Sequence, residues 1–177
     1  QRFLEKVEEY RKKYNIDLVA FCLIPNHFHL LVRQNSDIPV PKFVGVLLSS
    51  HSHYTSIKHD LPRGQLFQGR FGKTLIETEP SLLQVSRYIH LNPIKEKLLD
   101  MDITFQKSRT IRDKEIIKYL REYRWSSYPL YLSNQASNGV ISIDAHHILS
   151  LEKSRASYRR FVESKISDED FRNLENL

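Results

Sequence analysis

The sequence has almost no cysteine. Cys22 is the only one in 177 residues, so no disulfide can form within the chain, and the disulfide-rich scaffolds of small secreted proteins are excluded. No apolar run approaches the roughly 20 residues that a membrane-spanning helix needs, and no signal-peptide pattern is found. We therefore expect a cytoplasmic protein with no membrane partner.

Acidic residues are scarcer than basic ones. The chain has 27 Lys and Arg against 21 Asp and Glu, which gives a net charge of +6. This balance favours a polyanionic partner, nucleic acid before membrane, although many basic proteins bind nothing acidic. The sequence begins at Gln1, already inside a helical pattern. We therefore expect that a segment upstream is missing from it.

Hydrophobic periodicity predicts a series of helices and strands in the first 100 residues. The expected helices cover about 2–14, 41–57 and 78–92, and the expected strands cover 16–24, 27–33 and 66–77. Pro25-Asn26 predicts a turn, and the Asn92-Pro93 step should end the third helix. With one leading strand added, this order is that of a ferredoxin-like α+β fold, an antiparallel sheet with helices on one face.

The rest of the chain has a looser pattern. Helices are expected at about 111–124, 143–149 and 152–165, and a polar, turn-rich linker covers 133–139. We predict a main domain at 1–100 and a C-terminal helical accessory region at 101–177 packed on it. Trp125 and Tyr128 are interpreted as residues that pack these later helices.

Two histidines flank one apolar residue in the segment Pro25-Asn26-His27-Phe28-His29. Side chains alternate along a strand, so both imidazoles should project from one face and form a pair of metal ligands. His51-Ser52-His53 has the same spacing but lies in a helical pattern, where residues two apart face different ways. The spacing alone is equally consistent with two half-exposed histidines that bind nothing.

Tyr88 and Asn92 are four residues apart on the third expected helix, so they share one of its faces. Gln84 precedes them by a turn, and this places Tyr88 on the polar side of the helix. A tyrosine there is well placed for chemistry, but a surface tyrosine without any role is the commoner case. Together with the histidine pair, it favours a metal-assisted attack of a phenol on a phosphodiester.

Four ordered motifs carry a resemblance to a known family. They are Phe21-Cys22-Leu23-Ile24-Pro25-Asn26-His27-Phe28-His29-Leu30-Leu31, Leu66-Phe67-Gln68-Gly69-Arg70-Phe71, Arg87-Tyr88-Ile89-His90-Leu91-Asn92-Pro93 and Trp125-Ser126-Ser127-Tyr128. With them the sequence resembles the HUH single-tyrosine transposases, in particular the REP-associated tyrosine transposases and IS200-like transposases.

The resemblance implies a metal site made by His27 and His29 and completed by Asn92, with Tyr88 as the nucleophile. It also implies an enzyme that cuts and rejoins single-stranded DNA near a hairpin through a 5′-phosphotyrosine. Imidazole and phosphate ligands together suit Mn²⁺, and the family adds Mg²⁺; a structural zinc site would need four protein ligands. Some relatives share sites between two protomers, so a homodimer is one of the expected states.

Basic residues surround the expected site in the sequence. Those expected to contact DNA are Arg63, Arg70, Lys73, Arg87 and Lys95. Phe67 and Phe71 lie among them and either stack on bases or face the core of their strand, which we favour for at least one of the two. A nucleoid-associated transposase is thus expected.

Two other functions stay open at this point. A histidine-triad-like nucleotide hydrolase would need a third histidine where Leu31 stands. A catalytically inactive, domesticated DNA-binding module would keep the fold and the charge without the chemistry.

Overall fold

The chain has an α+β fold in which a two-stranded antiparallel sheet is combined with seven helices in the described part. The structure is a computed structural model that describes residues 1–62, 66–67, 69–100 and 114–164. Its elements group into two compact units. Unit 1 comprises 1–17, 32–73 and 137–142, and unit 2 comprises 18–31, 74–136 and 143–177. No helix in the described residues is long and apolar enough to cross a membrane.

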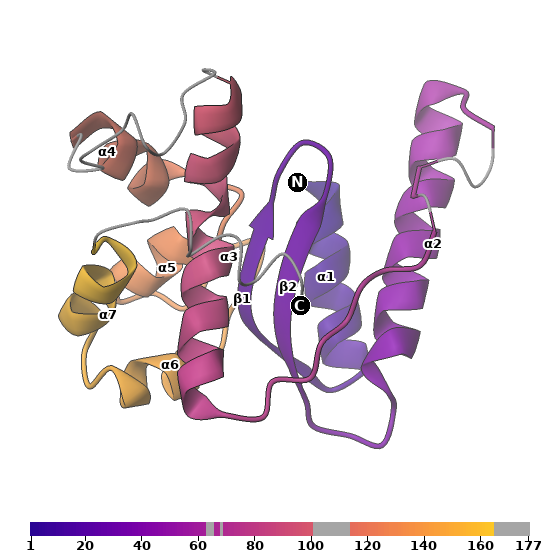
Figure 1. Cartoon of the computed structure of the whole chain (residues 1–177). Coiled ribbons are helices and arrows are strands. Elements are labelled where there is room, and N and C mark those ends of the chain that lie inside the picture. The colour runs from indigo at the N-terminus through magenta and orange to yellow at the C-terminus, as the bar shows by residue number, and fades with distance from the viewer. Residues whose placement is uncertain (63–65, 68, 101–113, 165–177) are drawn as a thin grey trace. The chain divides into compact units, whose positions relative to one another are not determined.

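Unit 1 is built around two packed helices, α1 (Arg2–Lys13) and α2 (Val40–His59), which lie side by side in Figure 1. Asn15, which follows the Tyr14 C-cap of α1, has a positive φ of 53°, a conformation that asparagine tolerates better than most residues and that is common where a helix ends. The apolar faces of both helices form the core of this unit. Its buried side chains include Phe3, Leu4, Val7, Tyr14, Phe43, Val44 and Leu47.

The strands β1 (Ile16–Leu23) and β2 (Phe28–Gln34) form a hairpin. The backbone N–H of Ile24 donates to the carbonyl of His27 at 3.0 Å, which closes the two-residue Pro25-Asn26 turn. Both strands and this turn agree with the sequence pattern. Val19 to Cys22 are all buried, as expected for the near-continuous apolar run at these positions.

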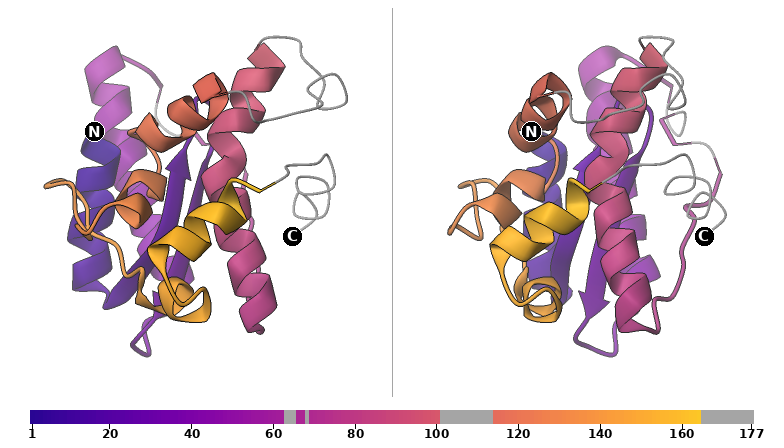
Figure 2. Two further views of the ribbon diagram at one scale, coloured as in Figure 1. Left: turned by 90° about the vertical axis from the view of Figure 1, so that its left-hand side faces the viewer. Right: turned by 60° about the vertical axis from the view of Figure 1, so that its left-hand side comes forward.

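Unit 2 is organised along α3 (Glu79–Asp100). The helices α4 (Lys114–Glu122), α6 (His146–Leu151) and α7 (Arg155–Val162) contact it, and α5 (Tyr128–Leu132) contacts α4 and α7. Figure 2 shows these short helices gathered beside α3 in two views. Short helices of this kind are stabilised mainly by the apolar side chains that they bury together, because their own propensity is too weak.

Two expectations about these elements were wrong, and one helix was not expected. The segment 66–77 forms no strand in its described residues, 66–67 and 69–77. The third helix does not end at Asn92-Pro93, because α3 continues through Pro93 to Asp100. The helix α5, which directly follows the Trp-Ser-Ser-Tyr motif, was not predicted from the sequence.

The Trp-Ser-Ser-Tyr motif pairs with the backbone of β1. Cys22 and Ser126 form an antiparallel bridge. Leu23 N–H donates to the Trp125 carbonyl at 2.8 Å, and Ser127 N–H donates to the Phe21 carbonyl at 2.9 Å. Unpaired N–H and C=O groups along a strand must find partners when they are buried. The motif therefore supplies hydrogen bonds that a further strand would otherwise make.

Candidate active site

His27 and His29 lie together as the strand pattern predicts. His29 is on β2 and His27 is the last residue before it. Their ring centroids are 4.8 Å apart, so both imidazoles lie on the same side of the hairpin. The control motif behaves differently, because His51 packs on Phe3 with 5.0 Å between ring centroids while His53 is exposed. Only the first pair is arranged to share one ligand.

Tyr88 reaches this pair from α3 within the same chain and the same unit. The centroids of the His29 and Tyr88 rings are 5.3 Å apart, in an edge-to-face arrangement. Tyr88 is 9% exposed, so the expectation that it occupies the polar side of its helix was wrong. From Ser86 to Ile94, α3 is buried on all sides, and its amide and imidazole groups face protein rather than water.

Asn92 lies one helical turn after Tyr88 and is buried. Its Nδ2 donates to the carbonyl of Tyr88 at 2.9 Å, which leaves Oδ1 as the atom that can accept a hydrogen bond or bind a cation. The amide also interacts with the side chains of His29 and Tyr88. The helix continues past this group through Pro93 to Asp100, although proline has no N–H to bond back to the preceding turn.

Burial keeps His29 neutral. Desolvation, with help from the neighbouring His27, lowers the pKa of His29 to about 4, against a smaller opposing effect of Asn92. The pKa of His27 is also lowered by burial, although the nearby Glu96 carboxylate opposes the shift. Neutral imidazoles have a free nitrogen lone pair, so at neutral pH both rings are in the form that binds metal ions.

Asn26 orients His27. Its Oδ1 lies 2.7 Å from His27 Nδ1, and a carbonyl oxygen can only accept, so Nδ1 carries the proton and Nε2 has the lone pair. This residue was not selected from the sequence as part of the site. Its position directly before the histidine, in the turn, was the signal that pointed to such a role.

The residues fit a divalent cation. His29 Nε2 is buried without a hydrogen-bond partner in the described part of the chain, and an unpaired buried nitrogen is costly unless a ligand satisfies it. Two neutral imidazoles and one amide oxygen are ligands that Mn²⁺ and Mg²⁺ accept. The described residues contain no group of three or more His, Cys, Asp and Glu suited to a metal, and the Asn92 amide would be the third protein ligand of such a cation.

Tyr88 is protonated at neutral pH. Burial raises the pKa of its phenol, and the contact with Asn92 opposes this only in part. The hydroxyl must therefore lose its proton during any attack that it makes. Lys95, one turn beyond Leu91 on the same helix, is half-buried, and burial lowers the pKa of its ammonium group. Its charge acts on both histidines.

The other predicted DNA contacts are dispersed. Arg70 and Lys73 are exposed in unit 1. Arg87 is buried, and its Nε donates to the Phe161 carbonyl at 3.0 Å while the guanidinium lies over the Phe161 ring. We therefore leave Arg87 out of the proposed DNA-contacting set. Arg63 lies outside the described residues. Phe67 and Phe71 are half-buried and belong to no strand.

A buried polar network holds the helix that carries Tyr88. His90 Nε2 lies 2.8 Å from Ser127 Oγ and its Nδ1 lies 2.8 Å from the Tyr158 hydroxyl. Ser127 Oγ accepts from the Phe21 N–H at 2.9 Å, and Tyr158 contacts Ser86 Oγ at 3.0 Å. The network joins α3 to β1, to the Trp-Ser-Ser-Tyr motif and to α7. It was not predicted from the sequence.

This network makes stability depend on pH. Complete burial among Tyr128, Tyr131, Tyr158 and Ser127 lowers the pKa of His90 to about 3, whereas an unfolded histidine titrates near 6.5. Between these values the unfolded chain binds the extra proton, so stability falls as the pH falls. From pH 7 to pH 5 we expect the wild type to lose about 2 kcal/mol more than His90→Gln, which cannot titrate. Urea unfolding at both pH values measures this difference, and equal losses would contradict a neutral His90.

Comparison with known families gives one match. A family model described as "Transposase IS200 like" matches residues 1–92. This range contains the histidine pair, Tyr88 and Asn92. No match was found among curated proteins or solved structures.

Proposed function

Because the chain belongs to the family of IS200-like transposases, we propose that it cuts and rejoins single-stranded DNA by forming a 5′-phosphotyrosine at Tyr88. The observation that carries this proposal is the approach of the Tyr88 ring to His29 within one chain, at 5.3 Å between ring centroids. Nucleophile and metal ligands are thus supplied by the same molecule. The family makes the function transposase-like, and the geometry supports this particular chemistry.

His27 Nε2, His29 Nε2 and Asn92 Oδ1 would hold the divalent cation, Mg²⁺ or Mn²⁺. When bound, it supplies positive charge for a non-bridging oxygen of the scissile phosphate and orients that phosphate for in-line attack. The protein residues do the rest. Asn26 sets the tautomer of His27. The hydrogen bond from Asn92 Nδ2 to the Tyr88 carbonyl holds the Asn92 amide in position one helical turn after Tyr88.

The reaction exchanges one ester for another. The Tyr88 phenolic oxygen bonds to phosphorus, and the bond from phosphorus to the 3′ oxygen breaks. The phenol's proton leaves during attack, and a proton is taken up by the departing 3′ oxygen, so the products are a 5′-phosphotyrosyl strand and a free 3′-hydroxyl. Attack by another 3′-hydroxyl reverses these steps and joins DNA without ATP. The charge of Lys95 acts on both histidines, so its side chain can contact a phosphate held there.

The substrate that we propose is single-stranded DNA next to a hairpin. The family resemblance supports this choice, and the excess of basic residues agrees with it. The histidine-triad alternative loses support, because Leu31, which stands where a third histidine would be needed, is buried in the core. A homodimer is not needed to complete the site, because Tyr88, His27, His29 and Asn92 all come from unit 2 of one chain.

Covalent capture tests the proposal. Wild-type protein is incubated with Mn²⁺ or Mg²⁺ and a set of 5′- and 3′-labelled hairpin oligonucleotides with single-stranded flanks. We expect a protein–DNA adduct that resists denaturing electrophoresis, carries only the label downstream of the cut, and maps to the Tyr88 peptide by mass spectrometry. DNA binding without an adduct across the set would support the inactive module instead.

A further inference from the structure

A carboxylate lies next to the proposed cation site without being one of its ligands. Glu96 is on α3, four residues after Asn92 and eight after Tyr88. A helix advances about 6 Å over four residues and returns to nearly the same side, so these three side chains follow one another along one side of α3. The hydrogen bond from Asn92 to the Tyr88 carbonyl shows that the first of these turns is regular. The Glu96 carboxylate therefore lies one turn beyond the Asn92 amide.

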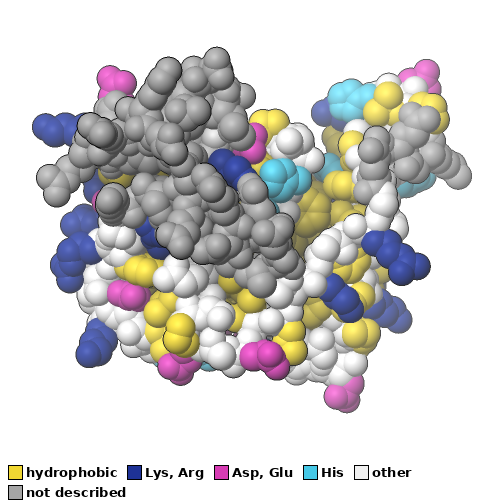
Figure 3. Space-filling model, viewed as in Figure 1, with side chains coloured by type: hydrophobic (Ala, Val, Ile, Leu, Met, Phe, Trp, Pro, Cys, Tyr) yellow, Lys and Arg dark blue, Asp and Glu magenta, His cyan; other side chains and the backbone are white. Residues whose placement is uncertain are grey.

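The neighbours of Glu96 come from three other parts of unit 2. Its charge acts on His27 in the hairpin turn, on the buried Cys22 of β1 and on Tyr123, which follows α4. Glu96 itself is half-buried. In Figure 3 an acidic and a basic side chain lie next to a histidine at the surface, close to where Figure 1 draws the hairpin turn. The carboxylate thus faces the side of the site on which His27 lies.

The proposed ligands of the cation carry no charge of their own. His27 and His29 are neutral imidazoles, and Asn92 supplies an amide. The ammonium group of Lys95 acts on both histidines and opposes a bound cation. A dication in such a site is stabilised by a carboxylate several ångströms away, even without direct contact. Because the described residues contain no group of three or more His, Cys, Asp and Glu suited to a metal, we assign Glu96 no direct bond to the cation.

The same negative charge acts on DNA with the opposite sign. A phosphate that enters the site without a cation is repelled by the Glu96 carboxylate, whereas a bound dication outweighs this repulsion. We propose that Glu96 is a positioning residue that retains the cation by its charge and excludes phosphate from the site while the cation is absent. Metal and DNA binding are then coupled, and each raises the affinity for the other. The inference rests on the proposed function for its cation and its phosphate.

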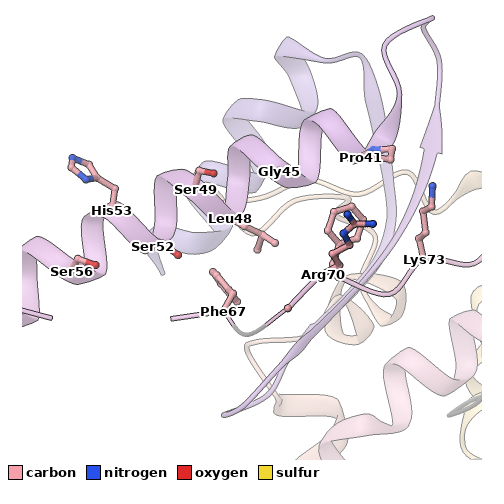
Figure 4. A pocket seen from close by; sticks show the side chains of 12 residues that line it. Pro41, Gly45, Leu48, Ser49, Ser52, His53, Ser56, Phe67, Arg70 and Lys73 are labelled. Atoms are coloured by element: carbon pink, nitrogen blue, oxygen red, sulfur yellow. The ribbon is translucent and has the colours of Figure 1, made fainter. Parts of the chain in front are cut away.

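His53 provides a contrast within the same chain. It is exposed on α2 in unit 1, and Figure 4 shows its imidazole pointing away from the pocket beside that helix. The described residues that line this pocket include no Asp or Glu. His27 is also exposed but has a carboxylate beside it. His53→Ala therefore reports weak Mn²⁺ binding by an imidazole without a nearby carboxylate, and it should leave the measured affinity unchanged.

Glu96→Gln removes the charge, keeps the shape of the side chain, and tests both halves of the proposal. Electron paramagnetic resonance of Mn²⁺ without DNA should show about tenfold weaker metal binding, at the lower end of the range for residues outside the ligand set. Fluorescence anisotropy in EDTA, with a labelled hairpin oligonucleotide that has single-stranded flanks, should show about threefold tighter DNA binding than in the wild type. Damage to the fold would weaken both, so opposite signs identify an effect of charge.

Three further variants and a change of salt separate charge from ligation. Glu96→Asp keeps the charge, so its Mn²⁺ affinity should stay within about threefold of the wild type. Lys95→Met should give the mirror result, with tighter Mn²⁺ binding and weaker DNA binding in EDTA. Glu122→Gln removes an exposed carboxylate at the end of α4 and should change neither. At an ionic strength of 1 M, where the Debye length is about 3 Å, the loss in Glu96→Gln should shrink, whereas the loss in His29→Ala should persist.

Three outcomes would overturn the proposal. One is unchanged Mn²⁺ affinity in Glu96→Gln. Another is a loss that neither Glu96→Asp restores nor salt reduces, which would make Glu96 a direct ligand or a packing residue. The last is DNA affinity in EDTA that stays the same or falls in Glu96→Gln. If the wild type forms the adduct and Glu96→Gln binds Mn²⁺ equally well, this inference fails alone. If Mn²⁺ binding follows the expected order but no adduct forms, the chemistry at Tyr88 fails alone.

Discussion

Replacing Tyr88 with phenylalanine is expected to lower adduct formation by at least about 10⁴-fold, because the variant lacks the oxygen that bonds to phosphorus. The fold should survive, since phenylalanine keeps the ring that contacts His29 at 5.3 Å between centroids. DNA affinity should change by less than about threefold, because no charge is lost. Single-turnover gel assays of adduct formation and anisotropy measurements of affinity separate the two effects.

Tyr123→Phe is the matched control. This tyrosine belongs to the same unit, and its hydroxyl donates to the Leu23 carbonyl at 2.9 Å, so its loss removes a hydrogen bond and no proposed nucleophile. We expect a cost of about 1 kcal/mol in unfolding free energy and a normal adduct. If Tyr88→Phe still formed the adduct at the wild-type rate, another residue would be the nucleophile and the role given to Tyr88 would be wrong.

Local periodicity was enough to predict the parts of the site that lie on regular elements. Alternation on a strand placed His27 and His29 on one side, and helical spacing placed Asn92 one turn from Tyr88. The structure has both arrangements, with 4.8 Å between the imidazole centroids and a hydrogen bond from Asn92 to the Tyr88 carbonyl. Such relations span a few residues, so backbone geometry alone determines them.

Proline was the misleading signal. The Asn92-Pro93 step should have ended the third helix, yet α3 continues to Asp100. The stretch from Ser86 to Ile94 is buried, and the packing of Ile89, Leu91 and Ile94 outweighs the local penalty of the missing N–H. The local helix propensity depends only on neighbouring residues in the sequence, so it does not take this burial into account.

Long-range contacts could not be predicted from the pattern. His90 was part of a motif, but its partners Ser127 and Tyr158 are 37 and 68 residues away in the sequence. The same holds for the pairing of the Trp-Ser-Ser-Tyr motif with β1, which involves backbone groups that every residue has. The segment 66–77 had the composition of a strand, but a strand needs a partner to supply its hydrogen bonds.

After Tyr88→Phe, the largest expected effect is the loss of Mn²⁺ affinity when the His29 imidazole is removed. His29→Ala removes a buried nitrogen that has no hydrogen-bond partner in the described part of the chain. We expect at least about 10²-fold weaker Mn²⁺ binding. Loss of a residue that hydrogen-bonds to a metal ligand typically weakens metal binding about 10–100-fold, and loss of the ligand itself should cost more. Electron paramagnetic resonance of Mn²⁺ measures this without DNA. Asn26→Ala should have a smaller effect, about 10-fold, since it removes only the hydrogen bond that sets the His27 tautomer.

A larger loss of Mn²⁺ affinity in His29→Ala than in Asn26→Ala is what a metal site predicts, whereas a role in packing predicts no change in Mn²⁺ affinity. His146→Ala, an exposed histidine of unit 2, controls for non-specific binding of Mn²⁺ to surface imidazoles and should leave the affinity unchanged. In the absence of metal, His29→Ala should lose less stability than the wild type between pH 7 and pH 5, because burial lowers the pKa of His29 to about 4 and the unfolded chain therefore binds a proton that the folded chain does not. Equal Mn²⁺ affinity in wild type, His29→Ala and Asn26→Ala would show that the imidazole pair holds no cation, and the chemistry proposed at Tyr88 would then lack its source of positive charge.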